Sequence, residues 1–253
     1  PDRAIFFRQS RVSAHAELHL IFSMLVTLNR LIRNPTVKEQ ARDLGLEDII
    51  SYGHIGYPVL QASDILLYKG LLVPVGEDQL PHLELTREIA RRFNTLYTPV
   101  FPEPEPLLTP FARLPGLDGR RMSKSLGNVI YISDSPSEIR SKIRTAFTDP
   151  LKLRKGDPGR PEICLIFTYH QKFNPNSEVV SQIAHECRSG TLGCVDCKSR
   201  CAQSLISYLE PIHQRRATIT SERVIEVLET GEEKARQIAS QTMSEVYTAM
   251  GMR

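Results

Sequence analysis

Four cysteines, Cys164, Cys187, Cys194 and Cys197, have the residue type and spacing that most directly indicate chemistry. The last two form a Cys-x-x-Cys pair, and a fifth cysteine, Cys201, follows them. A structural zinc site usually joins two such pairs, and a thioredoxin-like pair stands at a helix start after a strand, so neither pattern matches well. Simple packing does not usually place three thiols within eight residues. The residues alone therefore do not decide whether the cysteines bind zinc, bind an iron–sulfur cluster or only pack.

The stretch "RMSKS", Arg121 to Ser125, is a second candidate for chemistry. A loop of this composition can wrap a polyphosphate, because Lys124 supplies positive charge, Ser123 and Ser125 donate hydrogen bonds, and backbone amides complete the site. Such charge lowers a barrier most where negative charge develops in the transition state. Basic, serine-containing loops without any function are also common.

Asp64 lies in the apolar helical stretch "YPVLQASDILLY", one turn from Leu60 and Tyr68 and two turns from Tyr57. A lone carboxylate among Leu, Ile and Tyr side chains is costly unless it has a partner. We therefore expect Asp64 to meet a polar partner or a ligand.

A third group, Gly76-Glu77-Asp78, directly follows an apolar run that we expect to be a strand. Open α/β sheets bind ligands at the carboxyl ends of their strands. Gly76 allows a backbone to approach closely, and the two acids can hydrogen-bond ribose hydroxyls.

Hydrophobic patterning predicts the elements of the first half of the chain. We expect a buried strand in "RAIFFRQS", a long helix over residues 14–33 that is apolar on nearly all sides, and a helix opened by a capping box at Thr36. The long helix needs cover on two faces, either from a deep core or from a second subunit.

Further helices are expected from Pro58 to Gly70 and from Pro81 onward, on either side of a buried strand in "LLVPVGEDQ". This alternation of strand and helix predicts an α/β fold with a doubly wound parallel sheet.

The second half of the chain is expected to be loop and helix. Residues 99–119 are rich in Pro and Gly and predict a loop, and Ser135 opens a helix with a capping box completed by Glu138. The final helix, residues 221–250, is expected to break at Gly231. The domain boundary is expected near residue 130.

Composition limits the class of protein. The chain has 253 residues, 41% of them hydrophobic, and a net charge of +3, which suits a two-domain protein of mildly basic character. It has neither a run of eighteen apolar residues nor a signal-peptide layout, so we expect no membrane segment and a cytoplasmic location, or an organelle matrix if a leader is missing. Basic residues concentrate between Arg140 and Arg160, which suits phosphate binding but is also common on ordinary solvated faces.

"RMSKS" resembles the second signature of the class I aminoacyl-tRNA synthetases, which usually has Lys where this chain has Arg121. "YPVLQASDILLY" and "VPVGEDQLPHLELTREIARRFN" are similar to the amino-acid pocket and nucleotide-contact segments of the bacterial tryptophanyl-tRNA synthetases. The resemblance covers essentially the whole chain. It implies a Rossmann-like catalytic domain over residues 1–130, an all-helical anticodon-binding domain over 131–253, and a homodimer formed through the apolar helix around Leu18 to Leu31.

The resemblance also implies the reaction and its residues. The carboxylate of L-tryptophan attacks the α-phosphate of Mg·ATP, which gives tryptophanyl-adenylate and releases pyrophosphate. The tryptophanyl group is then passed to a terminal ribose hydroxyl of tRNA(Trp), and AMP leaves. Asp64 accepts the indole N–H, so that substrates without this donor are rejected. Further tryptophan contacts are implied for Tyr57, Gln61, Val73, Val75 and Gln79. ATP contacts are implied for Gly76, Glu77, Asp78, Arg121, Met122, Ser123, Lys124 and Ser125, of which Arg121, Ser123 and Lys124 act in catalysis. A tyrosine-specific relative, the alternative, typically has Ser in place of Glu77.

The cysteine spacing is similar to that of a subset of these synthetases that hold a [4Fe–4S] cluster, and "LGCVDCK" differs from "IGCVDCK" of that subset in one aliphatic residue. The resemblance therefore implies a cluster on Cys164, Cys187, Cys194 and Cys197, with zinc as the second choice and packing for Cys201. It also gives the basic stretch a tRNA-binding role. The implied tRNA contacts are Arg140, Arg144, Lys152, Arg154 and Lys155.

The first class I signature is expected upstream of this sequence. "GHIGYP" at residues 53–58 is similar to it, but no strand precedes it and Tyr57 is already assigned to the tryptophan pocket. We therefore expect the sequence to start within its first domain, about 70 residues into the family layout, and the chain alone not to activate tryptophan. A non-catalytic RNA-binding or regulatory relative is the rival hypothesis. An iron–sulfur electron carrier would leave Asp64, Gly76 to Gln79 and Lys124 without a purpose.

Overall fold

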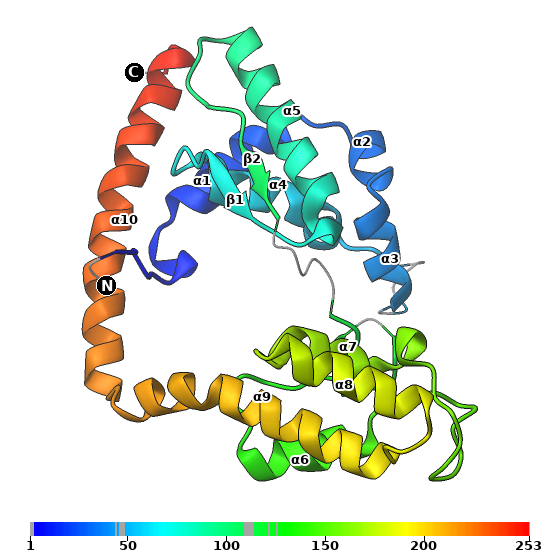
Figure 1. Ribbon diagram of the computed structural model, residues 1–253. Helices are drawn as coiled ribbons and strands as arrows, with labels where there is room; N and C mark the ends of the chain where they lie inside the picture. The colour runs from blue at the N-terminus through cyan, green and yellow to red at the C-terminus, as the bar shows by residue number, and fades with distance from the viewer. Residues whose placement is uncertain are drawn as a thin grey trace. The chain divides into compact units, whose positions relative to one another are not determined.

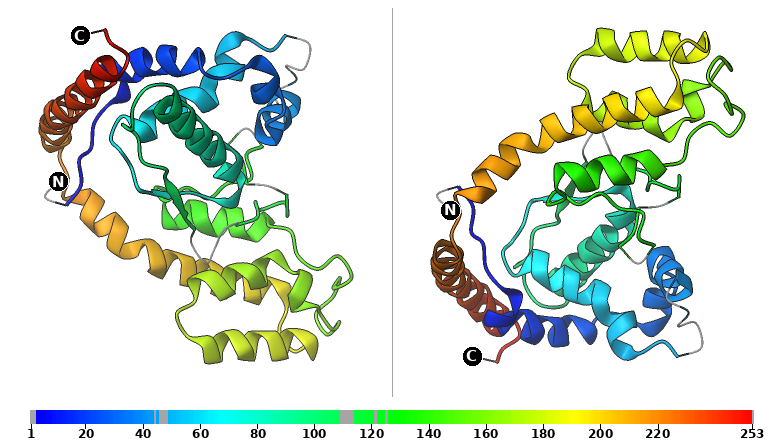
Figure 2. Two further views of the ribbon diagram at one scale, coloured as in Figure 1. Left: turned by 90° about the horizontal axis from the view of Figure 1, so that it is seen from above. Right: turned by 90° about the horizontal axis from the view of Figure 1, so that it is seen from below.

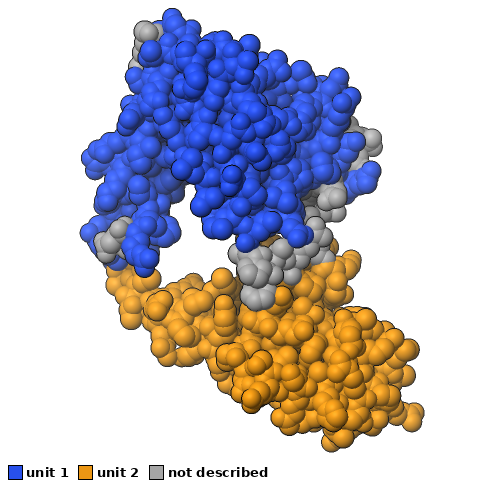
Figure 3. Space-filling view, turned by 45° about the horizontal axis from the view of Figure 1, so that its top comes forward, with its two compact units in different colours: residues 1–112, 221–253 blue, residues 113–220 orange. Residues whose placement is uncertain are grey.

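The computed structural model describes residues 3–43, 45, 49–108, 114–120, 122–124 and 126–252. Contacts divide the chain into two compact units, residues 1–112 with 221–253, and residues 113–220, which are coloured separately in Figure 3. Figure 1 labels the helices and strands, which are α1 (Ala14–Ser23), α2 (Leu28–Ile32), α3 (Pro35–Asp43), α4 (Tyr52–Leu66), β1 (Leu72–Pro74), α5 (Leu80–Leu96), β2 (Glu105–Leu107), α6 (Pro136–Thr145), α7 (Leu165–Phe173), α8 (Ser177–Arg188), α9 (Cys194–Ala217) and α10 (Ser221–Ala249).

The first unit is a helical core beside a short parallel sheet. Helices α1, α4 and α5 pack on one another, and α10 joins them through the same cluster of buried side chains, which includes Phe22, Leu66 and Phe93. Strands β1 and β2 pair in parallel, with Leu72 opposite Glu105. The α/β class with a parallel sheet is therefore confirmed.

The sheet is shorter and more exposed than predicted. The run "LLVPVGEDQ" forms only the three-residue strand β1, in which Leu72 is 60% exposed, so the expected burial is wrong. Its partner β2 lies inside the segment 99–119, which was expected to be loop throughout. Backbone bonds explain the pairing, because Glu105 N donates to Leu71 O at 2.8 Å and Val75 N donates to Leu107 O at 3.3 Å.

Two expectations near the N-terminus are also wrong. Residues 4–8 form no strand, and the side chains of Ile5 and Phe6 are exposed. The expected long helix over residues 14–33 is two helices, α1 and α2, because Thr27 caps the second one by accepting a hydrogen bond from Arg30 N at 3.4 Å.

Two helix starts are set by residues other than those predicted. Asn34, not Thr36, caps α3, since its Oδ1 accepts from Thr36 N at 3.1 Å. Helix α4 begins at Tyr52 because Ser51 Oγ accepts from His54 N at 3.2 Å, which leaves Pro58 inside the helix and puts "GHIG" in its first turns.

Two further helix starts were predicted correctly, whereas α4 ends at Leu66 and not at the expected Gly70. Pro81 lies in the first turn of α5, and the capping box of Ser135 with Glu138 opens α6. Both signals lie next to the helix start that they predict.

The second unit has its own core between α6, α7 and α9, built on Ile139, Ile143 and Tyr169. An ion pair between the exposed Arg160 and the buried Asp149 ties its long loop together, since Arg160 Nη2 donates to Asp149 Oδ1 at 2.6 Å. The hydrogen bonds from this guanidinium hold the pKa of Asp149 far below its usual range.

Helix α10 packs with the first unit, although it lies beyond the expected domain boundary near residue 130. The helix is continuous, so the expected break at Gly231 is wrong. Gly231 serves a close approach instead, because a Cβ at this position would overlap the carbonyl oxygen of Phe6. Figure 2 shows the N-terminal segment running beside α10, where Arg8 forms an ion pair with Glu232. The domain boundary of the functional protein stays a prediction.

A search of the described helices for a stretch long and apolar enough to cross a membrane finds none.

We predict that Gly231→Ala destabilises the protein, although Ala is favoured over Gly inside helices by about 1 kcal/mol. The added methyl group must displace the backbone of residue 6, and overpacking of this kind costs about 1–3 kcal/mol. Urea unfolding measures the change. Ser244→Ala, at a position on the same helix, is the matched control with little expected change. A Gly231→Ala variant more stable than the parent would contradict the close approach.

Candidate functional site

Asp64 is held by residues from two other segments of the first unit. Its Oδ1 accepts hydrogen bonds from His15 Nδ1 of α1 and from Gln9 Nε2, both at 2.7 Å. His15 is 4% exposed, whereas the Asp64 side chain is 38% exposed. The expected polar partner therefore exists, and the carboxylate still reaches the surface of the protein.

The imidazole of His15 continues this network. Its Nε2 lies 2.9 Å from the hydroxyl of Tyr68, and the ring of Phe7 stacks on it at a centroid distance of 5.9 Å. Burial, with a contribution from the charge of Asp64, raises the pKa of Tyr68 to about 12. Tyr68 therefore keeps its proton at neutral pH and can donate it.

A second network joins α4, α5 and the start of α3. Asn34 Oδ1 already accepts from the backbone of Thr36, so its Nδ2 donates to His82 Nδ1 at 3.0 Å. The proton of the neutral imidazole then lies on Nε2, which is 3.0 Å from the Tyr57 hydroxyl. Burial lowers the pKa of His82, so the ring is neutral, and Thr36 Oγ1 ties the network to Asp78 O at 3.2 Å.

Some of the predicted tryptophan residues meet in this region. Gln61 Nε2 donates to Gln79 Oε1 at 3.5 Å, and Gln79 Nε2 donates to Asp78 Oδ2 at 2.9 Å. Val73 and Val75, half-buried, lie on β1 and immediately after it. Side chains of α4 thus face the turn between β1 and α5.

The predicted ATP residues belong to both units. Gly76 precedes a short 3-10 turn over Glu77–Gln79 in the first unit. Met122, Ser123 and the exposed Lys124 belong to the second unit. Arg121 and Ser125 lie outside the described residues.

Asn128 anchors the "RMSKS" loop, which we call the signature loop, through the backbone of Ser123. Sequence reasoning missed this role. Asn128 Oδ1 accepts from Ser123 N at 2.8 Å, and its Nδ2 donates to Asp118 Oδ1 at 2.8 Å. The side chain is buried, and Gly116 leaves room for it, because a Cβ on residue 116 would overlap the Asn128 amide. The signal available in the sequence was a single amide inside the apolar run "LGNVIYI".

Asp118 completes this anchor as a carboxylate. Besides the Asn128 amide it accepts from Arg120 N at 3.0 Å and from Arg120 Nε at 2.7 Å. These bonds, that of Asn128 first, lower the pKa of Asp118 to about 2. The loop is therefore fixed on an acceptor that stays charged throughout the physiological pH range.

Four of the five cysteines line one small cavity of about 20 Å³ in the second unit, and they are the four predicted ligands. Cys164 precedes α7, Cys187 lies in the last turn of α8, and Cys194 and Cys197 lie in the first turn of α9. Cys201 does not line the cavity; it packs with its sulfur 3.9 Å from Ile166 O.

Two further residues adjoin the thiols. His170 Nε2 lies 3.2 Å from Cys197 O and 3.6 Å from Cys197 Sγ. A Cβ at Gly159 would lie 2.6 Å from Cys187 Sγ, so glycine makes room for this sulfur. Burial, and after it the charges of the neighbouring thiols, raises the pKa of Cys197.

The basic stretch is partly at the surface. Arg140 and Arg144, one turn apart on α6, line a cavity of about 240 Å³ with Lys198 of α9. Arg154 and Lys155 are exposed as well. Lys152 is different, because it is buried and its ammonium donates to the carbonyls of Asp157 and Cys187. Its charge is therefore used inside the unit.

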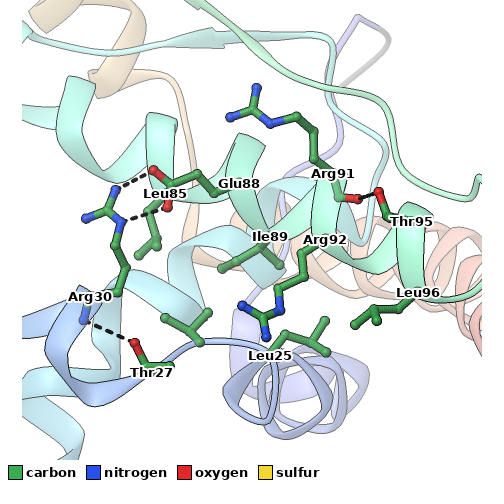
Figure 4. A pocket seen from close by; sticks show the side chains of 11 residues that line it. Leu25, Thr27, Arg30, Leu85, Glu88, Ile89, Arg91, Arg92, Thr95 and Leu96 are labelled. Atoms are coloured by element: carbon green, nitrogen blue, oxygen red, sulfur yellow. Dashed lines mark hydrogen bonds and ion pairs between the residues drawn. The ribbon is translucent and has the colours of Figure 1, made fainter.

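A larger cavity of about 640 Å³ lies between the α1–α2 turn and α5 (Figure 4). Arg30 reaches Glu88 there through two bonds of 2.6 and 2.7 Å, and Arg92 extends beside Leu25. None of the predicted site residues lines this cavity.

Comparison with known proteins identifies the family. The family model for class I tRNA synthetases of tryptophan and tyrosine matches residues 1–210. The tryptophan–tRNA ligase of Thermotoga maritima is 46% identical over 254 residues, which cover 100% of this chain and 77% of that protein. The enzyme of the same name from Aquifex aeolicus is 40% identical and is covered to 82%.

Solved structures agree with these matches. Tryptophanyl-tRNA synthetase from Campylobacter jejuni, complexed with ADP and tryptophan, superposes with a TM-score of 0.82 at 30% identity, over 99% of this chain and 78% of that one. The synthetase from Mycoplasma pneumoniae gives a TM-score of 0.81 at 27% identity, over 100% and 78%. The sequence matches and the shared fold together show that this chain belongs to the tryptophan–tRNA ligases, within the class I tRNA synthetases.

Proposed function

We propose that this member of the tryptophan–tRNA ligases binds tryptophan beside α4 and carries out the two-step ligation with the residues named below. The observation that carries the proposal is the pair of polar networks that end on Asp64 and on Tyr57. Each fixes a pocket side chain from a second element, as a preorganised binding site requires.

Tryptophan recognition is assigned to six residues. Asp64 is the acceptor for the indole N–H, and the hydroxyl and amide groups of Tyr57, Gln61 and Gln79 are polar contacts for the substrate. Val73 and Val75 supply the apolar wall. Buried polar groups of this kind discriminate strongly, because a substrate without the matching donor leaves the acceptor unpaired.

ATP, with Mg²⁺, is assigned to Gly76, Glu77 and Asp78 in the first unit and to residues 121–125 in the second. Lys124 is assigned to stabilise the negative charge that develops on the phosphates. Ser123 and Arg121 are assigned to assist it in catalysis. The chemistry needs positioning and charge neutralisation, and no protein nucleophile. In the Campylobacter jejuni structure the bound nucleotide is ADP.

We predict that Lys124→Ala in the full-length protein lowers the rate of tryptophan-dependent exchange of pyrophosphate into ATP by about 10²–10³-fold, as for other removed transition-state donors. Asn128→Ala should give a smaller loss in the same parameter, because the lysine remains but its loop loses the anchor at Ser123 N. Tryptophan affinity, measured by calorimetry, should stay unchanged in both. Ser189→Ala, an exposed position of the same unit, is the control. An unaltered exchange rate in Lys124→Ala would contradict the assignment.

Transfer RNA is assigned to the exposed basic residues of the second unit. Arg140 and Arg144 converge with Lys198 on one cavity, and Arg154 and Lys155 extend the positive surface. We leave Lys152 out of this surface because its ammonium is bonded inside the unit. Positive charge at this spacing suits successive phosphates.

We predict that the double variant Arg140→Ala/Arg144→Ala binds tRNA(Trp) more weakly and lowers the slope of log affinity against log salt by about one to two, since each lost phosphate contact removes about 0.9. Filter binding at several salt concentrations measures the slope. Arg216→Ala is the matched control, because it lies on α9 about 27 Å along the helix from Lys198. The same slope in the double variant and the parent would refute the surface.

A [4Fe–4S] cluster is the finer assignment for the four cysteines. The support is the donor set, four thiols from three helices around one cavity. In the described part of the chain no three His, Cys, Asp or Glu side chains are close enough to hold a single metal ion. A zinc ion needs all its sulfurs at about 2.3 Å from one point, whereas a cubane carries its thiolates on four separate irons.

The cavity itself is smaller than a cluster, so the cysteine side chains must turn outward to hold one. The apolar side chains of Leu192 and Ile166 line the cavity with the thiols, and Gly159 leaves space beside Cys187. A bound cluster would supply the positive charge that buried thiolates need, and it would tie α7, α8 and α9 together.

We predict about four irons per chain after anaerobic purification, with visible absorption near 400 nm typical of such clusters. Cys194→Ser should lose the iron and Cys201→Ser should keep it, because Cys201 lies outside the cavity. Zinc at about one per chain, or iron lost equally in both variants, would overturn the assignment.

We also propose that the protein is a homodimer that works in the cytoplasm. The α1–α2 segment carries exposed apolar side chains at Leu20 of α1, Met24 after it and Leu28 of α2, and Met24 is 72% exposed. A second copy of the chain would cover these side chains.

A further inference from the structure

His15 holds Asp64 in one orientation. The imidazole is 4% exposed and lies between Asp64, Tyr68 and the stacked ring of Phe7, so its position is fixed on three sides. A ring that is packed in this way can orient its partner, because neither nitrogen can move without breaking a bond.

The two oxygens of the Asp64 carboxylate have different tasks. Oδ1 accepts from both His15 Nδ1 and Gln9 Nε2 at 2.7 Å. Among the described residues, Oδ2 accepts no hydrogen bond, and the side chain is 38% exposed. The carboxylate is therefore held by one oxygen and presents the other.

The direction of the protons follows from the donor and acceptor types. A carboxylate is only an acceptor, so the bond at His15 Nδ1 requires a hydrogen on that nitrogen. In the neutral ring, Nε2 is then an acceptor and takes the hydrogen of the Tyr68 hydroxyl, which stays protonated. Tyr68 thus selects the His15 tautomer that can donate to Asp64.

We propose that His15, with Tyr68 behind it, is a positioning residue for tryptophan selection, which turns Oδ2 of Asp64 toward the indole N–H. The inference rests on the proposed role of Asp64 as the indole acceptor. It adds the relay from Tyr68 through His15 that keeps this acceptor oriented.

The decisive measurement compares tryptophan with an analogue whose indole N–H is replaced by sulfur, β-(benzothiophen-3-yl)alanine. His15→Phe keeps a planar ring but removes both nitrogens. In the full-length protein it should lower the ratio of kcat/KM for tryptophan over the analogue by at least tenfold, because the carboxylate keeps only the exposed Gln9 donor, which does not hold it in one orientation. KM for tryptophan should rise, and KM for ATP should not change.

Three further variants keep the test falsifiable even if His15→Phe folds poorly. His15→Asn retains a donor near Asp64 and should recover part of the ratio. Tyr68→Phe should lower the ratio by a smaller factor, since the ring keeps its place but loses its tautomer partner. Ala16→Ser, at an exposed position of the same helix α1, should leave the ratio unchanged.

The outcome for Asp64 separates the two hypotheses. If Asp64→Ala keeps the preference for tryptophan, the proposed role of Asp64 fails, and the relay fails with it. If Asp64→Ala loses the preference but His15→Phe and Tyr68→Phe keep it, the relay alone is overturned. Nitrogen-15 chemical shifts give an independent reading of the His15 tautomer, and a proton on Nε2 in the neutral ring would also overturn the relay.

Discussion

A carboxylate on an apolar helix needs internal partners, and this need organises the first unit. Asp64 obtains both of its donors from the segment that precedes and enters α1. The same segment passes α10, where the backbone of Phe6 crosses Gly231 and Arg8 pairs with Glu232. About ten residues thus connect the proposed tryptophan acceptor on α4 with a helix from the other end of the chain.

In the second unit, polar side chains likewise find internal partners, and these hydrogen bonds hold its loops. Asn128 closes the segment between Asp118 and Ser123, and Asp149 closes the segment up to Arg160, in each case with a buried or half-buried polar side chain as the anchor. Backbone that lacks a helix or strand partner is bonded to side chains instead. The loop around Ser123 and the loop between Asp149 and Arg160 are therefore held by particular side chains.

Sequence signals worked where the cause is local. The capping box at Ser135 and the proline at the start of α5 needed no distant contact. They failed where a distant partner decides the outcome. Gly231 looked like a helix breaker but makes room for Phe6, and the apolar run at residues 4–8 looked like a strand but packs along α10. The roles of His15 and Asn128 were missed, because they depend on partners that the sequence alone does not bring together. The gathering of four cysteines on one cavity was expected from a family resemblance, and no pattern within the chain would have produced it.

The return of α10 to the first unit has a consequence for biosynthesis. Residues 113–220 are continuous and have their own core, so they can fold as soon as they leave the ribosome. The first unit differs, because Ala235, Met243 and Val246 belong to the same core as Phe22 and Phe93. Until the last helix is translated, the nascent first unit must keep part of its apolar surface open, and the later unit is complete before the earlier one.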